Sequence, residues 1–315
     1  MTLCRDVPKY ARLLQTFAEG DPDCILIVEF YGDSDRELGA KVDRLESLMR
    51  QGRCGATAPV RALDPGQQQN VWAVRKGGLG LLMSIKGDFK PIPFIEDAAV
   101  PVEHLAEYIR RIESFCNQIG TRVAYYAHAS AGCLHVRPML DTKQASEVAK
   151  LPEILSFSAE LVGGYGGSLS SEHGDGRARS WLNERFFGPD LYRLFRQVKE
   201  VFDPRTLLNS GNVVDAPRMT ENLRFGAEYR ARLPEPEIDF RHDLGLDRAI
   251  EMCNGAGACR KTAAGTMCPS FMVTRDEEHS TRGRANALRA VLSGRLPATE
   301  WTRHSMQQVL DLCIA

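Results

Sequence analysis

The sequence predicts an α+β fold, and two observations within the first 215 residues support this class. Apolar residues recur at helical spacing over Val102–Gln118. Two short apolar runs, Arg122–His128 and Leu134–Pro138, follow and are joined by a tight turn, which is the pattern of a β-hairpin. Strands and helices mixed in this way favour an antiparallel sheet with helices covering one face.

The segments before this hairpin contribute further elements. Asp23–Gly32 (DCILIVEFYG) is an apolar run of strand length that ends in a glycine. Ser34 and Glu37 then form a capping-box pair at the start of a helix. Further short strands are expected at Ala58–Asp64 and within Phe94–Pro101.

After the hairpin, a helical pattern spans Lys143–Val162, with a break or restart expected at Pro152. A strand is expected near Gly166–Ser171. Cys24 lies in a strand pattern and Cys116 on the apolar side of a helix, so both are expected to be buried as small hydrophobic residues.

The chain divides into three parts by composition. Residues 1–215 carry the mixed α and β pattern, and residues 239–315 are helical and cysteine-bearing. Residues 216–238 contain several prolines and many charges without a clean period, which is typical of a linker or an extended wrapping segment. We therefore expect two domains joined by this linker.

Composition excludes several classes of function. Lys plus Arg number 40 and Asp plus Glu 41, so no overall charge favours nucleic acid or an anionic membrane surface. No apolar run approaches the ~20 residues of a membrane span, and the first residues do not have the pattern of a signal peptide. A cytoplasmic protein is expected, and nine cysteines in such a chain indicate thiols, a metal or clusters rather than disulfides.

Two short segments combine histidine with a carboxylate. His128 and His135 flank the tight loop HASAGCLH, and Glu172 and His173 follow the glycine-rich stretch of GGSLSSEHGDG. Imidazole nitrogens and a carboxylate are the usual ligands of a divalent metal that keeps an open position. Spacing alone leaves open the alternative that these are ordinary histidines without a metal.

Three segments together resemble a known family. His128–His135 is similar to a His-Ala-Gly-x-Gly-x-Leu-His loop, and Ser170–Gly176 to a Ser-x-Glu-His-Gly-x-Gly element. Val198–Asn212 resembles a helix that ends in Lys-x-x-Phe/Leu-Asp-Pro, followed by an Asn-Pro-Gly-Lys turn. In this order the motifs resemble the carboxy-terminal domain of FAD-linked oxidases, the group of D-lactate and D-2-hydroxyglutarate dehydrogenases. The resemblance covers about Asp23 to Asn212 and implies a ferredoxin-like antiparallel sheet with helices on one face.

The resemblance also implies roles. His128, His135 and Glu172 would hold a divalent metal, with zinc expected, and His173 would be the general base. The chemistry is coherent, because a bound cation lowers the pKa of a substrate hydroxyl and an imidazole can take that proton. The hydride would pass to FAD, since flavin accepts hydride and protein side chains do not.

Substrate and flavin contacts follow from the same resemblance. Arg75, after a tryptophan in WAVRKGGLGLL, resembles the family's substrate-binding arginine, and Arg137 is a second candidate. Each could instead be a surface residue or the partner of a structural carboxylate. The turn near Asn209 and Gly211 would approach FAD through its backbone. The metal loop departs from the family pattern at three positions, which are Ser130, Ala131 and Cys133. These departures favour the subgroup that is fused to iron–sulfur domains.

A cysteine cluster lies in the last part of the chain. Cys253, Cys259 and Cys268 fall within sixteen positions, and a proline follows the third, which is how many ferredoxin-type motifs end. The usual spacing would place a further cysteine at Ala256. The pattern favours iron–sulfur over zinc, and buried unligated cysteines stay a third reading.

The string Thr274–Arg289 resembles the ferredoxin-like half of large fused FAD and iron–sulfur dehydrogenases. This implies that residues 239–315 are a small, mostly α-helical 4Fe-4S module, truncated where Cys313 would open a second motif. Cys253, Cys259, Cys268 and Cys313 are its candidate ligands. Because two-cluster ferredoxins exchange their last cysteines, we expect little or no cluster on this chain alone.

These features predict the carboxy-terminal part of a flavin-dependent D-2-hydroxy acid dehydrogenase of D-lactate, D-2-hydroxyglutarate or glycolate type. Electrons would pass from FAD, bound mostly by a domain upstream, to iron–sulfur clusters and a downstream acceptor. The alternative is a non-catalytic electron-relay or metal-binding subunit that partners a separate flavoprotein. The expected location is the cytoplasm, and peripheral contact with the inner membrane stays open.

Overall fold

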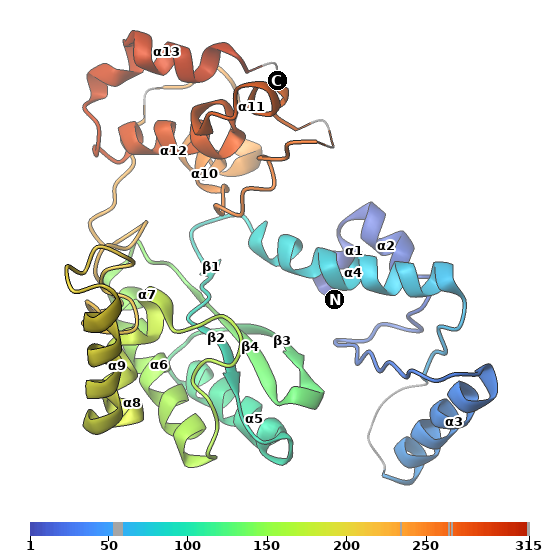
Figure 1. Ribbon diagram of the computed structural model, residues 1–315. Coiled ribbons are helices and arrows are strands. Elements are labelled where there is room, and N and C mark those ends of the chain that lie inside the picture. Colours follow the sequence, from blue (N-terminus) through green and yellow to red (C-terminus); the bar gives the residue numbers. More distant parts are fainter. Residues whose placement is uncertain (53–58, 234, 264, 266, 314–315) are drawn as a thin grey trace. The chain divides into compact units, whose positions relative to one another are not determined.

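The computed structural model describes residues 1–52, 59–233, 235–263, 265 and 267–313. The chain forms two compact units, Met1–Ile85 and Lys86–Ala315 (Figure 1). This division falls inside the predicted first domain, and the predicted boundaries near residues 215 and 239 stay predictions. Cys54 lies outside the described residues.

The first unit is helical in its described residues. Its helices are α1 (Thr2–Arg5), α2 (Pro8–Leu14), α3 (Asp35–Gln51) and α4 (Pro65–Met83). Helices α1, α2 and α4 contact one another, and a small core gathers Cys4, Leu14, Phe17 and Val74. The Ser34 half of the predicted capping box is confirmed, because the Ser34 hydroxyl accepts a hydrogen bond from the Glu37 backbone amide. The Glu37 carboxylate accepts from the backbone amide of Asp33.

Two predicted strands in this unit are wrong. Residues 23–32 and 59–64 form no strand, and Ala58 lies outside the described residues. Cys24 is exposed rather than buried. A strand exists only where a neighbour pairs its N–H and C=O groups, and the described part of this unit offers neither segment such a neighbour.

The second unit contains a four-stranded antiparallel sheet. Its strands are β1 (Lys90–Pro91), β2 (Ile95–Ala99), β3 (Val123–His128) and β4 (Cys133–Leu140). Each of the other three strands pairs with β4, which is therefore central. The predicted hairpin is confirmed, with Val123 opposite Pro138 and His128 opposite Cys133.

Helices α5 (Val102–Gln118) and α6 (Ala145–Gly164) contact each other, and the core between them and the sheet is apolar. The predicted burial of Cys116 is confirmed, and burial raises the pKa of its thiol to about 11. The predicted break at Pro152 is wrong, because α6 continues through it. The neighbouring Leu151 and Ile154 are buried in the core, and this packing offsets the one backbone hydrogen bond that a proline removes.

A β-bulge interrupts strand β2. Ile95 lies opposite Val136 and Ala98 opposite Leu134, so three residue steps of β2 match two of β4. Such an extra residue bends a strand and re-aims its side chains. The bulge lies at Glu96 and Asp97, and both residues turn toward the same site.

Beyond α6, helices and one isolated bridge make up the regular structure of the described residues. The predicted strand near Gly166–Ser171 is reduced to a single bridge between Ala99 and Ser168. The helices that follow are α7 (Gly176–Arg179), α8 (Asn183–Phe187), α9 (Pro189–Phe202), α10 (Leu246–Glu251), α11 (Pro269–Thr274), α12 (Thr281–Leu292) and α13 (His304–Asp311). Short 3-10 turns are η1 (Ala129–Ala131), η2 (Ser180–Leu182), η3 (Arg241–Asp243), η4 (Glu277–His279) and η5 (Ala298–Thr302). The helical character predicted for residues 239–315 is confirmed for the described residues.

Ion pairs tie α10 to the segments that flank the sheet. The Lys143 ammonium lies 2.8 Å from Asp88 and also pairs with Glu251 of α10. Arg248 of α10 lies 2.6 Å from the same Asp88. Among the described helices, none has the length and apolar character that crossing a membrane requires.

Candidate active site

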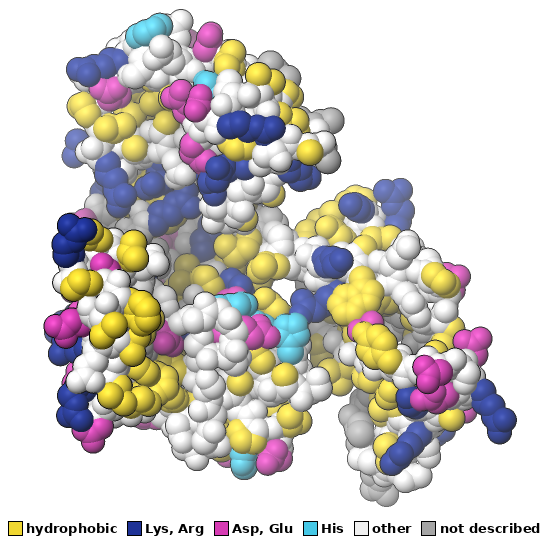
Figure 2. Space-filling model, in the orientation of Figure 1, with side chains coloured by type: hydrophobic (Ala, Val, Ile, Leu, Met, Phe, Trp, Pro, Cys, Tyr) yellow, Lys and Arg dark blue, Asp and Glu magenta, His cyan; other side chains and the backbone are white. Residues whose placement is uncertain are grey.

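The site begins with the alternation of side chains along β4. Leu134 and Val136 point into the core, so His135 and Arg137 point to the opposite face of the sheet. Both are nonetheless buried, because the bulge of β2 and the loop after α6 cover them. Figure 2 shows histidine and acidic side chains gathered on the face that it draws.

The tight turn between β3 and β4 brings the two loop histidines together. The ring centroids of His128 and His135 are 5.3 Å apart. Gly132 closes this turn at φ +66°, and a Cβ there would lie 1.9 Å from the Val100 carbonyl oxygen. The Val100 amide in turn donates to the Gly132 carbonyl, at 3.1 Å. Only glycine permits this close approach of two backbones.

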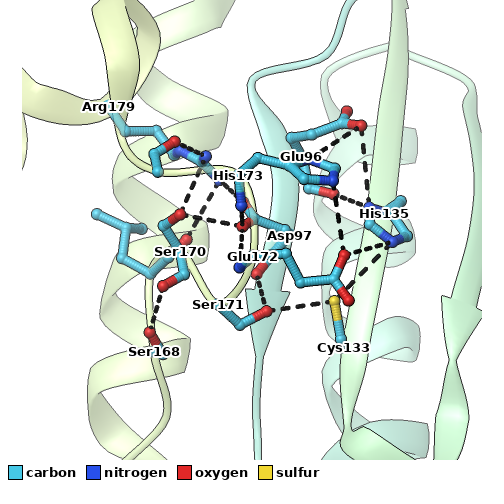
Figure 3. A network of polar contacts seen from close by, with 12 residues as sticks. Glu96, Asp97, Cys133, His135, Ser168, Ser170, Ser171, Glu172, His173 and Arg179 are labelled. Carbon is cyan, nitrogen blue, oxygen red and sulfur yellow. Dashed lines mark hydrogen bonds and ion pairs between the residues drawn. The ribbon is translucent and has the colours of Figure 1, made fainter.

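The loop that carries Glu172 and His173 is attached to β2. Ser168 and Ala99 exchange two backbone hydrogen bonds of 2.8 and 2.9 Å. The Asp97 carboxylate then accepts hydrogen bonds from the backbone amides of Glu172 and His173, both at 2.6 Å (Figure 3). One carboxylate therefore sets the direction in which two neighbouring side chains leave the backbone.

Asp97 is fully buried, and its partner is the buried guanidinium of Arg179. Arg179 also donates to the Gly174 carbonyl within the same loop. Burial alone raises the pKa of Asp97, but the amides of His173 and Glu172 and the Arg179 guanidinium outweigh it and hold the pKa at about 2. The carboxylate is thus charged at neutral pH.

His128, His135 and Glu172 converge as the metal prediction requires. His128 Nε2 lies 3.9 Å from Glu172 Oε1, and His135 Nε2 lies 3.7 Å from Glu172 Oε2. Ligands at ~2.1 Å in a tetrahedron lie about 3.4 Å apart, so these three donors fit one small cation. His135 is buried, whereas the side chains of His128 and Glu172 are 49% and 39% exposed, which leaves room for a further ligand.

A backbone contact fixes the tautomer of His135. Its Nδ1 lies against the Glu96 carbonyl oxygen, which can only accept, so Nδ1 carries the proton and Nε2 keeps its lone pair. Burial lowers the pKa of His135, which favours the neutral ring that a metal needs. A second group of donors, Glu96 with His135 and His173, is also close. Arg137 already holds Glu96 at 2.6 Å, so we favour the first group.

His173 lies between two carboxylates. Its Nε2 is 3.5 Å from Glu172 Oε2, and its Nδ1 is 3.7 Å from Glu96 Oε1. Its ring stacks on that of His135 at a centroid distance of 5.4 Å. The side chain is 46% exposed and lines a cavity of about 480 Å³, so it can reach a bound molecule and still contact the metal-site residues.

The residues predicted to contact substrate and flavin lie in three different places. Arg137 lines the cavity, but Glu96 is its partner, as the structural alternative supposed. Arg75 lies in α4 of the first unit, and its role stays a prediction. Asn209 and Gly211 form a turn after α9 with positive φ angles of 48° and 73°, and their contact with FAD also stays a prediction.

The cysteine cluster lies at the start of α12. The Cys268 sulfur accepts from the Thr281 backbone amide at 3.1 Å, and the Cys259 sulfur accepts from the Arg282 amide at 3.4 Å. Cys253 is partly buried and Cys313 is exposed. Among the described residues, no three cysteine sulfurs come close enough to share one small ion.

Sequence reasoning missed Glu96, Asp97 and Arg179. A signal was available, because FIEDAAV places two adjacent carboxylates inside an otherwise apolar strand. A strand that alternates faces cannot bury both on one side unless it contains a bulge. Adjacent acids in such a run therefore indicate an irregular strand with a polar function.

A comparison with known protein families identifies the family of this chain. Residues 7–213 match the model of the FAD linked oxidases, C-terminal domain. The chain belongs to this family. The α+β arrangement of the described residues, an antiparallel sheet with helices, fits that assignment. The ferredoxin-like detail of the predicted fold stays a prediction.

Relatives in the FAD linked oxidase family extend over most of the chain. It is 34% identical over 295 residues to a D-2-hydroxyglutarate dehydrogenase of Pantoea ananatis, a match that covers 90% of this chain and 27% of the relative. It is 35% identical to the Escherichia coli D-2-hydroxyglutarate dehydrogenase, over 84% of this chain and 26% of the relative. An Archaeoglobus fulgidus D-lactate dehydrogenase is 28% identical over 60% of this chain and 45% of its own length. The chain thus spans about a quarter of the length of the first relatives.

Proposed function

We propose that this chain supplies the substrate and metal site of an FAD-linked dehydrogenase that oxidises D-2-hydroxy acids. The observation that carries the proposal is the convergence of His128, His135 and Glu172 beside His173 at the wall of a cavity. The names of the relatives, which include D-2-hydroxyglutarate and D-lactate dehydrogenases, agree with it.

Each residue has a defined task in this proposal. His128 and His135 present Nε2, and Glu172 presents its carboxylate, to a divalent cation, for which zinc suits the donor set. When bound, such a cation would lower the pKa of the substrate hydroxyl. His173 takes the hydroxyl proton at Nε2, the ring nitrogen that lies beside the Glu172 carboxylate.

Two features keep this base in place. The backbone amide of His173 is held by Asp97, and its ring is held by stacking on His135. The hydride leaves the same carbon that carries the hydroxyl, and FAD supplies the acceptor when it is bound. We propose that FAD is held mostly by a partner domain, with Asn209 and Gly211 contributing backbone contacts.

The test combines this chain with an FAD-binding partner polypeptide of a D-2-hydroxy acid dehydrogenase. Zinc-dependent reduction of an artificial dye by a D-2-hydroxy acid, but not by its L-enantiomer, supports the proposal. A mixture that binds FAD and zinc but oxidises no 2-hydroxy acid refutes it. Zinc binding alone supports the second candidate function, a non-catalytic metal-binding or electron-relay subunit.

The cysteines favour a role in electron relay beside this chemistry. Backbone amides that donate to cysteine sulfur tune the potential of an iron–sulfur cluster, and Thr281 and Arg282 present two such amides at Cys268 and Cys259. We propose Cys253, Cys259 and Cys268 as ligands of a 4Fe-4S cluster, with Cys313 as a further candidate. A downstream electron acceptor and a cytoplasmic location, with or without peripheral membrane contact, belong to the same proposal.

A further inference from the structure

Three arginines line the cavity beside His173, and two of them are already neutralised. Arg137 lies 2.6 Å from Glu96, and Arg179 is paired with the buried Asp97. The third, Arg177, is exposed, and among the described residues no carboxylate lies within ion-pair distance of it. It is therefore the arginine of this cavity whose charge is available to a ligand.

Arg177 also lies where the cavity continues. It lines a neighbouring cavity of about 430 Å³, together with Ile92, Phe94 and Leu223. Pro93 and Ala178 line both spaces, so the two cavities meet at Arg177. His173 and Arg177 line the same cavity, so a molecule held beside His173 can extend toward Arg177 and the partly apolar wall beyond it.

We propose that Arg177 binds the remote carboxylate of a dicarboxylic 2-hydroxy acid and so selects diacids over monoacids. This inference rests on the proposed function, because the metal site must hold the hydroxyl end of the same molecule. A guanidinium binds a carboxylate through two parallel hydrogen bonds, a geometry that the remote carboxylate of the ligand can fill. A methyl group in the place of that carboxylate leaves Arg177 without a partner, which is the basis of discrimination.

The neighbouring residues fit this role. Arg137 and Arg179 cannot replace Arg177 without exposing Glu96 or Asp97 as an unpaired carboxylate. Asp175 lines the same cavity, but its side chain is itself a carboxylate and cannot bind the carboxylate of a ligand. The selectivity therefore depends on one side chain.

The experiment measures ligand binding to the zinc-loaded chain by calorimetry. The ligands are D-2-hydroxyglutarate and D-2-hydroxypentanoate, which share a five-carbon chain and differ in a carboxylate against a methyl group. Arg177→Gln should raise the dissociation constant of the diacid by about 10- to 100-fold. The dissociation constant of the monoacid should change by less than about twofold. Arg193→Gln, which alters an exposed arginine of α9, is the matched control and should change neither.

The outcomes separate the two proposals. Equal weakening of both ligands, or no change for the diacid, overturns the role of Arg177 and leaves the proposed function intact. If the wild-type chain binds neither ligand in the presence of zinc, the proposed function fails and this inference fails with it. Selective loss of the diacid in Arg177→Gln, with Arg193→Gln unchanged, supports the assignment.

Discussion

Removal of the Asp97 carboxylate is the most informative single perturbation of this site. In Asp97→Ala, the guanidinium of Arg179 is left buried without its partner, and the amides of Glu172 and His173 lose their acceptor. An uncompensated buried charge costs about 3–5 kcal/mol, which is a large fraction of the stability of a domain. We expect urea unfolding to show a loss of this size in the free energy of unfolding, with an unchanged slope.

A double variant shows whether the charge is the cause. Because removal of both partners leaves no unpaired ion, Asp97→Ala with Arg179→Met should be more stable than Asp97→Ala alone. Asp239→Ala is the matched control, since its partner Arg241 is exposed, and it should cost less than about 0.5 kcal/mol. Additive losses in the double variant would refute the role assigned to the buried pair.

The same carboxylate predicts a pH dependence. The folded-state pKa of Asp97 is about 2, below the ordinary value near 3.9, so its contribution is present above about pH 4 and is lost as pH falls toward 2. The difference in pKa corresponds to about 2–3 kcal/mol. The difference in unfolding free energy between wild type and Asp97→Asn should therefore narrow over this window, and a difference that is constant from pH 5 to pH 2 would contradict the assignment.

The other predictions concern metal, base, turn and cluster. His135→Ala should lower zinc affinity by at least about tenfold in calorimetry, because one of three ligands is lost. His173→Ala should lower turnover of the FAD-complemented enzyme by roughly 10²–10⁴-fold while zinc content stays the same. Gly132→Ala should destabilise the chain by clearly more than Gly120→Ala, since both have positive φ but only Gly132 meets a backbone atom. Chain purified in air should contain little iron, and a stoichiometric four-iron cluster after anaerobic reconstitution would show that the ligand set is complete.

Periodicity was sufficient to predict the part of the fold that carries a local signal. Helix α5 and the hairpin of β3 and β4 were predictable, because each buries one face of a short segment. The run 23–32 has an equally apolar pattern but forms no strand. Whether an apolar segment becomes a strand depends on a partner elsewhere in the chain, and no local pattern contains that information.

In the candidate site, too, some residues have a local sequence signal and others depend on contacts elsewhere in the chain. Its histidines and Glu172 stand out because these residue types recur in motifs. Asp97 and Glu96 take part through the bulge of β2, which appears only when the strand is paired with β4. Arg177 and Arg179 lie two residues apart with identical chemistry, and only the buried partner of Arg179 distinguishes their roles.

The end of strand β2 anchors both loops that carry the candidate metal ligands. Val100, directly after the strand, holds the turn of the two histidines, and Ala99, its last residue, holds the loop of Glu172. The backbones of Gly132 and Gly167 lie close to the carbonyls of Val100 and Ala99, so both ligand-bearing loops are attached to two consecutive residues. None of Ala99, Val100, Gly132 and Gly167 lines the cavity beside His173. We therefore expect that a change at Arg177 alters the proposed substrate preference and leaves the attachment of the two loops intact.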